Sequence, residues 1–215
     1  MYVPAHFKPD DGEVLELLGR HAFADLVTVT GRGMLATPMP FLHDRTDDRP
    51  DVGPWGVLVG HLARNNEQWR EPAQGQALVI VRGPDAYISP GWYAATREHG
   101  RVVPTWNYIT AHVYGRLVIH DDPAWVDALV RRLTDRFEAH GTPPWSVDDA
   151  PRAYIVGQLR AIVGIEVMIE RVEGKLKLGQ NRSDADIEGA VAGLRATGSP
   201  ELADAMEAAR RSSPR

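Results

Sequence analysis

Several stretches of the chain alternate apolar and polar side chains or are rich in β-branched residues, which is the pattern of β-strands. The pattern predicts about six strands, over residues 25–30, 34–41, 55–62, 76–82, 105–120 and 162–172. Gly31 to Gly33 forms the turn between the first two strands, which predicts a hairpin. Pro38 and Pro40 cannot donate ladder hydrogen bonds, so the second strand is expected at a sheet edge or interrupted. The apolar run Ala-Leu-Val-Ile-Val within 76–82 predicts a strand buried on both faces.

Other stretches place apolar residues three and four positions apart, which is the pattern of amphipathic helices. The longest, residues 123–140, has an apolar stripe and follows Asp122, which can cap the helix. The stripe consists of Val126, Leu129, Val130, Leu133 and Phe137. Further helices are expected over residues 11–20, over 151–160, from Ser183 onward and from Ser199 onward. Residues 63–70 are expected to form one or two helical turns, and residues 43–54 an exposed loop.

Six strands, with four or five helices and no internal repeat, predict a mainly β protein with peripheral helices. We expect a small antiparallel barrel, formed within a domain of residues 1–182. Residues 183–215 are expected to form a helical C-terminal tail that packs on the barrel or on a partner subunit.

Composition excludes several classes of protein. With 24 lysines and arginines against 29 aspartates and glutamates, the net charge is −5, which argues against a direct nucleic-acid binder. The two C-terminal helices carry many acidic residues, so a DNA-reading helix-turn-helix is disfavoured. The chain has no cysteine, which excludes disulfides, thiolate metal sites and cysteine nucleophiles. It has neither a long apolar run nor a signal-peptide core, so we expect a cytoplasmic protein that does not enter a membrane.

The first candidate binding segment lies where the strand over residues 55–62 ends. Backbone N–H groups at the start of a helix attract anions. His61, Arg64 and Asn65 add donors at this place, which predicts a phosphate site. The alternative is a capped helix start with a solvated arginine.

The second candidate is a stretch rich in aromatic residues. It contains six rings, which suits stacking on a planar ligand, although such rings also suit a core or a dimer interface. They are Tyr87, Trp92, Tyr93, Trp106, Tyr108 and Tyr114, with Thr105 and Asn107 interleaved.

The third candidate is a basic segment after the last strand. Its side chains are able to reach an anion or a ring edge, and a surface strand is the alternative. They are those of Lys177, Gln180, Asn181 and Arg182.

No catalytic residue or metal site is assigned. The histidines have no metal-ligand spacing, and no nucleophile elbow or phosphate-binding Walker loop occurs.

Five segments together resemble the PaiB family in order and spacing. They are residues 1–7, 60–69, 83–93, 103–108 and 177–182. The resemblance implies an FMN-binding negative transcriptional regulator, linked to repression of protease and sporulation genes. It also implies a six-stranded split barrel of the FMN-binding type, and a homodimer with flavin in the cleft between two barrels. Gly179 departs from the family, in which serine is usual at this position.

Carried over to this chain, the resemblance implies a flavin site made of three groups of residues. His61, Arg64 and Asn65 would hold the phosphate. Thr105, Trp106 and Asn107 would line the cleft, while Lys177, Gln180 and Asn181 would come from the end of the last strand.

Four functions remain open at this point. The leading one is a flavin-responsive regulator that acts through a protein partner or indirectly, because direct DNA contact is hard to reconcile with the negative charge. The second is an FMN-dependent oxidoreductase or flavin reductase of the pyridoxamine-phosphate-oxidase-like fold. Haem binding is disfavoured in the form that needs a C-terminal histidine, because none follows His140. Direct DNA binding is the fourth.

Overall fold

The computed structural model describes residues 1–45, 49–71 and 73–212. Two compact units are formed, each from several parts of the chain. Unit 1 comprises Met1–Leu17, Arg82–Ala111 and Glu173–Arg215, and unit 2 comprises Leu18–Val81 and His112–Val172. The predicted division at residue 182 stays a prediction.

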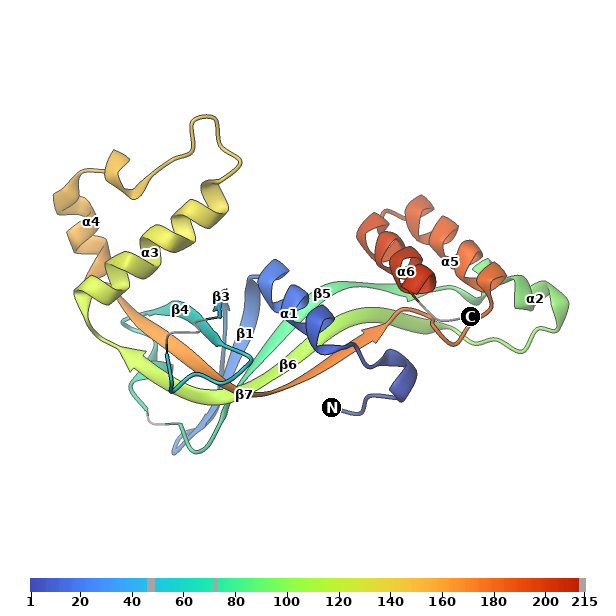
Figure 1. Ribbon diagram of the computed structural model, residues 1–215, viewed down its shortest axis with the longest axis horizontal. Coiled ribbons are helices and arrows are strands. Elements are labelled where there is room, and N and C mark those ends of the chain that lie inside the picture. Colours follow the sequence, from blue (N-terminus) through green and yellow to red (C-terminus); the bar gives the residue numbers. More distant parts are fainter. Residues whose placement is uncertain (46–48, 72, 213–215) are drawn as a thin grey trace. The chain divides into compact units, whose positions relative to one another are not determined.

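The described residues form seven strands in one sheet (Figure 1). They are β1 (Phe23–Thr30), β2 (Gly33–Pro40), β3 (Leu42–Asp44), β4 (Val57–Ala63), β5 (Ala77–Ile88), β6 (Thr105–His120) and β7 (Ile162–Lys177). Their order is β2-β1-β5-β6-β7-β4-β3, so the sheet is open, and the pairs β1–β2, β1–β5, β3–β4 and β4–β7 are antiparallel. The expected number was six. The additional strand is the short β3, which pairs with β4 at the start of the expected loop 43–54.

The hairpin β1–β2 is confirmed, and its prolines lie where the sequence placed them. β2 lies at the edge of the sheet, where a strand pairs on one side only. Pro38 and Pro40, which lack a backbone N–H donor, are therefore tolerated there. In the apolar run of β5, Val79 and Val81 are buried, whereas Leu78 and Ile80 are only partly buried. One face of this run is therefore buried as expected, whereas the other face is only partly buried.

Unit 2 is built around the face of β7 that carries alternate residues Val163, Ile165 and Val167, all with no exposed surface. On the opposite face, helix α3 (Pro123–Glu138) packs through Leu129 and Leu133 against strand residues such as Met168.

The helix that packs on this face begins as the sequence predicted. The carboxylate of Asp122 accepts hydrogen bonds from the backbone N–H groups of Ala124 and Trp125, so it caps α3. Phe137, expected in the apolar stripe of α3, is instead 52% exposed, because it lies in the last turn beyond the packed part of the helix.

Unit 1 is built where the ends of β5, β6 and β7 are covered on one face by two helices. These are α5 (Asp184–Ala196) and α6 (Pro200–Ser212), which lie side by side in Figure 1. Ile187, Leu194 and Met206 of the helices form one buried cluster with Ile88 of β5 and Leu178 after β7. Ser183 caps α5 by accepting from the backbone N–H of Asp186, as predicted.

The remaining helices are short. They are α1 (Asp11–Arg20), α2 (Ala94–Glu98) and α4 (Arg152–Leu159), with 3-10 turns at Ala5–Phe7, Glu67–Trp69, Pro90–Trp92 and Val147–Asp149. None of the helices in the described ranges is long and apolar enough to span a bilayer.

Helix α5 approaches the 3-10 turn Pro90–Trp92 through two glycines. A Cβ atom at Gly189 would overlap the backbone carbonyl of Trp92, and one at Gly193 would overlap its indole ring. Glycine at these positions allows the close approach that buries the apolar face of α5.

We predict that Gly193→Ala lowers the free energy of unfolding by about 1–3 kcal/mol, because the added methyl group overpacks the contact with Trp92. The matched control is Gly157→Ala in α4, where a Cβ atom meets nothing within 4 Å. The control should leave stability unchanged or raise it by up to about 1 kcal/mol, since alanine is the better helix former. Urea unfolding followed by circular dichroism measures both; equal effects of the two substitutions would contradict the close-packing argument.

Candidate functional site

Three of the predicted site residues lie together in unit 1, where β6 begins and β7 ends. The ammonium group of Lys177 donates to the hydroxyl oxygen of Thr105 at 2.6 Å and to the carbonyl oxygen of Trp106 at 2.8 Å. Both acceptors are neutral. Lys177 therefore links the start of β6 to the end of β7. Within the described chain, its positive charge has no carboxylate partner.

A second lysine lies two residues earlier on the same face of β7. Lys175 is 9% exposed and donates to the carbonyl oxygen of Tyr2 at 3.2 Å, again a neutral acceptor. Its ammonium group lies 5.3 Å from the ring centroid of Tyr108 and 6.0 Å from that of Tyr2. The ammonium group of Lys177 lies 5.9 Å from the same Tyr108 ring. These cation–π contacts stabilise the charges only in part.

Trp106, whose backbone carbonyl accepts from Lys177, has a half-exposed ring. Its exposed fraction is 51%, its indole N–H donates to the carboxylate of Asp85 at 2.9 Å, and Tyr87 meets it edge-on with ring centroids 6.3 Å apart. Strand alternation places Trp106 and Tyr108 on one face of β6. We call Tyr87, Trp106, Tyr108, Lys175 and Lys177 the aromatic–lysine surface.

Asp85 and Tyr87 complete the surroundings of Trp106, although neither was assigned to the site from sequence. The strand predicted from sequence ended at residue 82, whereas β5 continues to Ile88, so that Asp85 and Tyr87 share one of its faces. What the sequence did not contain is the pairing that brings this face of β5 beside Trp106.

Asn107 points to the opposite face of β6. It is 2% exposed, and its amide nitrogen lies 3.5 Å from the sulfur of Met206 in α6. The structure therefore does not bring Asn107 to the aromatic–lysine surface with its neighbours in sequence, because adjacent strand residues face opposite ways.

Gln180 and Asn181 lie in the turn after β7. The side-chain amide of Gln180 donates to the carbonyl of Leu176 at 2.7 Å and accepts from the N–H of Leu178 at 2.9 Å, so it stabilises the turn. Gly179 has φ +85°, a left-handed conformation that favours glycine, which is consistent with glycine rather than serine at this position. Asn181 is exposed.

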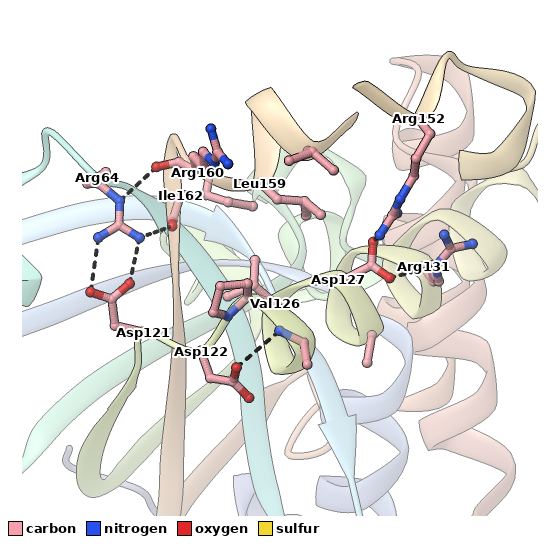
Figure 2. Close-up of a pocket in the computed structure, with 14 residues that line it drawn as sticks. Arg64, Asp121, Asp122, Val126, Asp127, Arg131, Arg152, Leu159, Arg160 and Ile162 are labelled. Carbon is pink, nitrogen blue, oxygen red and sulfur yellow. Dashed lines mark hydrogen bonds and ion pairs between the residues drawn. The ribbon is translucent and has the colours of Figure 1, made fainter. Parts of the chain in front are cut away.

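The other predicted residues, His61, Arg64 and Asn65, lie in unit 2. Figure 2 shows that Arg64 is held by four hydrogen bonds. Its guanidinium donates to both carboxylate oxygens of Asp121, at 2.5 and 3.0 Å, and to the carbonyl oxygens of Arg160 and Ile162 at 2.8 and 3.1 Å. The hydrogen bonds to Asp121 raise the pKa of Arg64, and in turn they lower the pKa of Asp121.

The helical segment after Arg64 is shorter than expected. A single 3-10 turn, Glu67–Trp69, replaces the one or two helical turns predicted over residues 63–70. Its first donors are already used, since the side chain of Asn66 accepts from the N–H of Gln68. Gln68 is buried and donates to the carbonyl of Leu26 at 3.1 Å, which ties the segment to β1. Asn65 is exposed.

His61 faces a different cavity from the one that Arg64 lines. This cavity has a volume of about 270 Å³ and includes Leu133, Phe137 and Trp145. Burial lowers the pKa of His61, so its imidazole is neutral at pH 7. Arg64 lines a larger cavity of about 770 Å³ between α3 and α4 (Figure 2). His61 and Arg64 are thus directed into separate spaces, and their joint role in holding a phosphate stays a prediction.

No group of three or more histidine, aspartate or glutamate side chains that could hold a metal ion occurs within residues 1–45, 49–71 and 73–212.

Residues 1–171 match a protein family described as a putative FMN-binding domain. The protein "Protease synthase and sporulation protein PAI 2" of Bacillus subtilis is 31% identical over 212 residues, which cover 96% of this chain and 97% of that protein. An uncharacterized protein of Emericella nidulans is 31% identical over 183 residues, 73% of each chain.

Two solved structures share the fold. The flavocytochrome Anf3 from Azotobacter vinelandii superimposes with a TM-score of 0.54 at 14% identity, over 79% of this chain and 68% of that one. The FAD and heme binding protein from Mycobacterium smegmatis gives 0.53 at 21% identity, over 86% and 78%. At these identities the likeness shows the fold alone, and it confirms the predicted fold class.

Two partly buried histidines make stability depend on pH. Burial lowers the pKa of His61 and of His43, whose ring nitrogen lies 2.7 Å from the carbonyl oxygen of Trp55. Below the ordinary value of 6.5 the unfolded chain binds protons that the folded chain excludes. Stability should therefore fall as the pH drops from about 7 through 6 and below.

The double variant His43→Gln/His61→Gln should show a flatter fall of the urea midpoint between pH 7.5 and 5. The control, His140→Gln at an exposed position, should follow the unchanged protein. An undiminished pH slope in the double variant would refute the assignment to these two histidines.

Proposed function

We propose that the chain, which belongs to this family of FMN-binding domains, works as a homodimeric flavoprotein with regulatory function. Its membership of the family confirms the PaiB-family resemblance and FMN as the predicted cofactor. The flavin is proposed to lie against the aromatic–lysine surface of unit 1, in a cleft that a second copy completes. When bound, FMN supplies redox chemistry, while the protein supplies binding, orientation and electrostatics.

The observation that carries this proposal is the pair of lysines whose charges no carboxylate among the described residues neutralises. Lys175 and Lys177 donate to neutral oxygens only, in a protein of net charge −5 with many ion pairs. A cation left uncompensated beside exposed aromatic rings is suited to an anionic ligand with a planar body. FMN combines these two features in its phosphate and its isoalloxazine ring.

The half-exposed rings support the planar part of the ligand. Trp106 and Tyr87 are 51% and 46% exposed, although large aromatic side chains usually gain stability by burial. Stacking of the isoalloxazine on Trp106 would cover this face, and Asp85 holds the indole in position.

A second copy supports the other side of the ring. A surface of this kind covers only one face of a planar ligand, whereas the exposed Tyr2 and Val103, 82% and 64% accessible, leave apolar area nearby for a subunit interface. Homodimerisation would close the cleft and exclude water from the flavin.

Regulation is proposed from the Bacillus subtilis relative, whose printed name refers to protease synthesis and sporulation. Direct DNA contact is not part of the proposal. In the C-terminal helices, Arg195 pairs with Asp204 and Glu207, and Arg210 pairs with Glu188. Because carboxylates already neutralise these arginines, a protein partner or an indirect effect is the better route.

We predict that Lys177→Met weakens FMN binding at least about tenfold, since one charge-assisted contact is lost. Trp106→Ala should weaken it by a similar factor through lost stacking. The matched control is Arg97→Met, which removes an exposed cation from α2 of unit 1 and should leave the affinity unchanged.

Quenching of FMN fluorescence during titration gives the affinities, and light scattering during gel filtration gives the mass against the 23.8 kDa of one chain. A monomer, or a protein that neither carries flavin nor takes it up, would refute the proposal. Rapid reduction of the loaded protein by NADH or NADPH, with turnover of an acceptor, would replace the regulatory role with that of an oxidoreductase.

The predicted phosphate role of Arg64 has its own test. Arg64→Ala should weaken FMN binding if the guanidinium contacts the phosphate. Asp121→Asn frees that guanidinium from its carboxylate and should leave the affinity equal or higher. Equal loss in both variants would instead assign the Arg64–Asp121 pair to holding the ends of β4 and β6 together.

A further inference from the structure

The cavity of about 770 Å³ in unit 2 has the dimensions of a small-molecule site. It lies between α3 and α4, and its apolar lining comes from both helices and from the start of β7. The apolar residues are Ala124, Val126, Ala128, Val156, Leu159 and Ile162. Figure 2 shows Leu159 and Val126 between two charged groups, Arg64 with Asp121 at one end and Arg152 with Asp127 at the other.

The carboxylates that line this cavity are all engaged. Asp121 accepts from Arg64, and Asp127 accepts from Arg131 at 3.0 Å and from Arg152 at 3.3 Å. Asp122 accepts from backbone N–H groups at the start of α3. None of these carboxylates is directed at a fourth arginine.

That fourth arginine is Arg160. Its carbonyl oxygen accepts from Arg64, but its exposed guanidinium donates to no acceptor in the part of the chain that the structure describes. The lining has four arginines and three aspartates, and Arg131 also pairs with Asp148 outside the lining. Arg160 is thus the arginine of this lining whose guanidinium has no carboxylate partner among the described residues.

A single uncompensated guanidinium beside an apolar lining determines the class of ligand. A planar guanidinium binds a carboxylate through two parallel hydrogen bonds. Asp121 and Asp122 would repel an anion of higher charge, such as a phosphate ester, and a short polar anion would leave the apolar lining uncovered. The ligand that fits is a monoanion with an apolar body.

We propose that the cavity between α3 and α4 binds a hydrophobic monocarboxylate, with its carboxylate on Arg160 and its chain along Val156 and Leu159. The proposal does not depend on flavin binding, because none of the aromatic–lysine surface lines this cavity.

The test is a calorimetric titration of the full chain with acetate, butanoate, hexanoate and octanoate. Affinity should rise about threefold to fourfold for each added CH₂ group that becomes buried. 1-Octanol, which has the chain without the charge, should bind at least about fivefold more weakly than octanoate. Affinities that do not change with chain length would overturn the proposal.

Variants at the exposed Arg160 keep the fold intact and test the charged end. Arg160→Ala should weaken octanoate binding at least about fivefold, Arg160→Glu should abolish it, and Arg160→Lys should retain part of it. The control is Arg101→Ala, which removes an exposed arginine from unit 1 and should change nothing.

Unchanged octanoate affinity in Arg160→Glu would overturn the proposal. Competition with FMN separates the two sites. Octanoate and FMN should bind independently, and Arg160→Glu should retain FMN affinity. Displacement of octanoate by FMN, with loss of FMN binding in Arg160→Glu, would show that this cavity belongs to the flavin site. That result would overturn a separate carboxylate site while supporting flavin binding itself.

Discussion

The hydrogen bonds of Lys177 to Thr105 and Trp106 join the end of β7 to the start of β6, and the candidate flavin site depends on them. They place a cation at the backbone of the half-exposed Trp106, and no carboxylate in the described part of the chain pairs with it. Alternation along β6 then decides which neighbours take part, because Tyr108 shares the face of Trp106 while Asn107 is buried toward α6. A ligand-binding face and a packing face are thus two sides of the same strand.

Ion pairs determine which cations of the molecule keep an unneutralised charge. Most arginines that the structure places near a candidate surface are already paired, as Arg64 is with Asp121, Arg131 with Asp127 and Arg195 with Asp204. Such exposed pairs contribute little to stability, but they partly neutralise the charge of the arginines. The cations proposed to bind an anion have neutral partners, or none, among the described residues; they are the two lysines of the aromatic–lysine surface and Arg160.

Much of the fold could be predicted from local patterns. The β1–β2 hairpin, the long strands β6 and β7, and the capping of α3 by Asp122 and of α5 by Ser183 depend on neighbouring residues, so a single sequence contains the signal. β3 was missed because it has three residues and exists through its pairing with β4. Phe137 was placed in a buried stripe because periodicity shows which residues share a face but not how far along a helix that face is covered.

The candidate site was harder to predict than the fold, because its contacts join residues that are far apart in the sequence. The sequence placed Arg64 at a strand end, where a phosphate is plausible, but its carboxylate partner Asp121 lies 57 positions away. Neither periodicity nor local spacing indicates such a contact, and the contact changes the role that the guanidinium can have. Thr105, Trp106 and Lys177 were named together only through the family resemblance; their hydrogen bonds now give a physical reason for the grouping. The donors of an arginine near a ligand-sized cavity therefore have to be counted before a role is assigned to it. By that count, the guanidinium of Arg160 has no partner among the described residues, whereas that of Arg64 has four acceptors and its phosphate role stays a prediction.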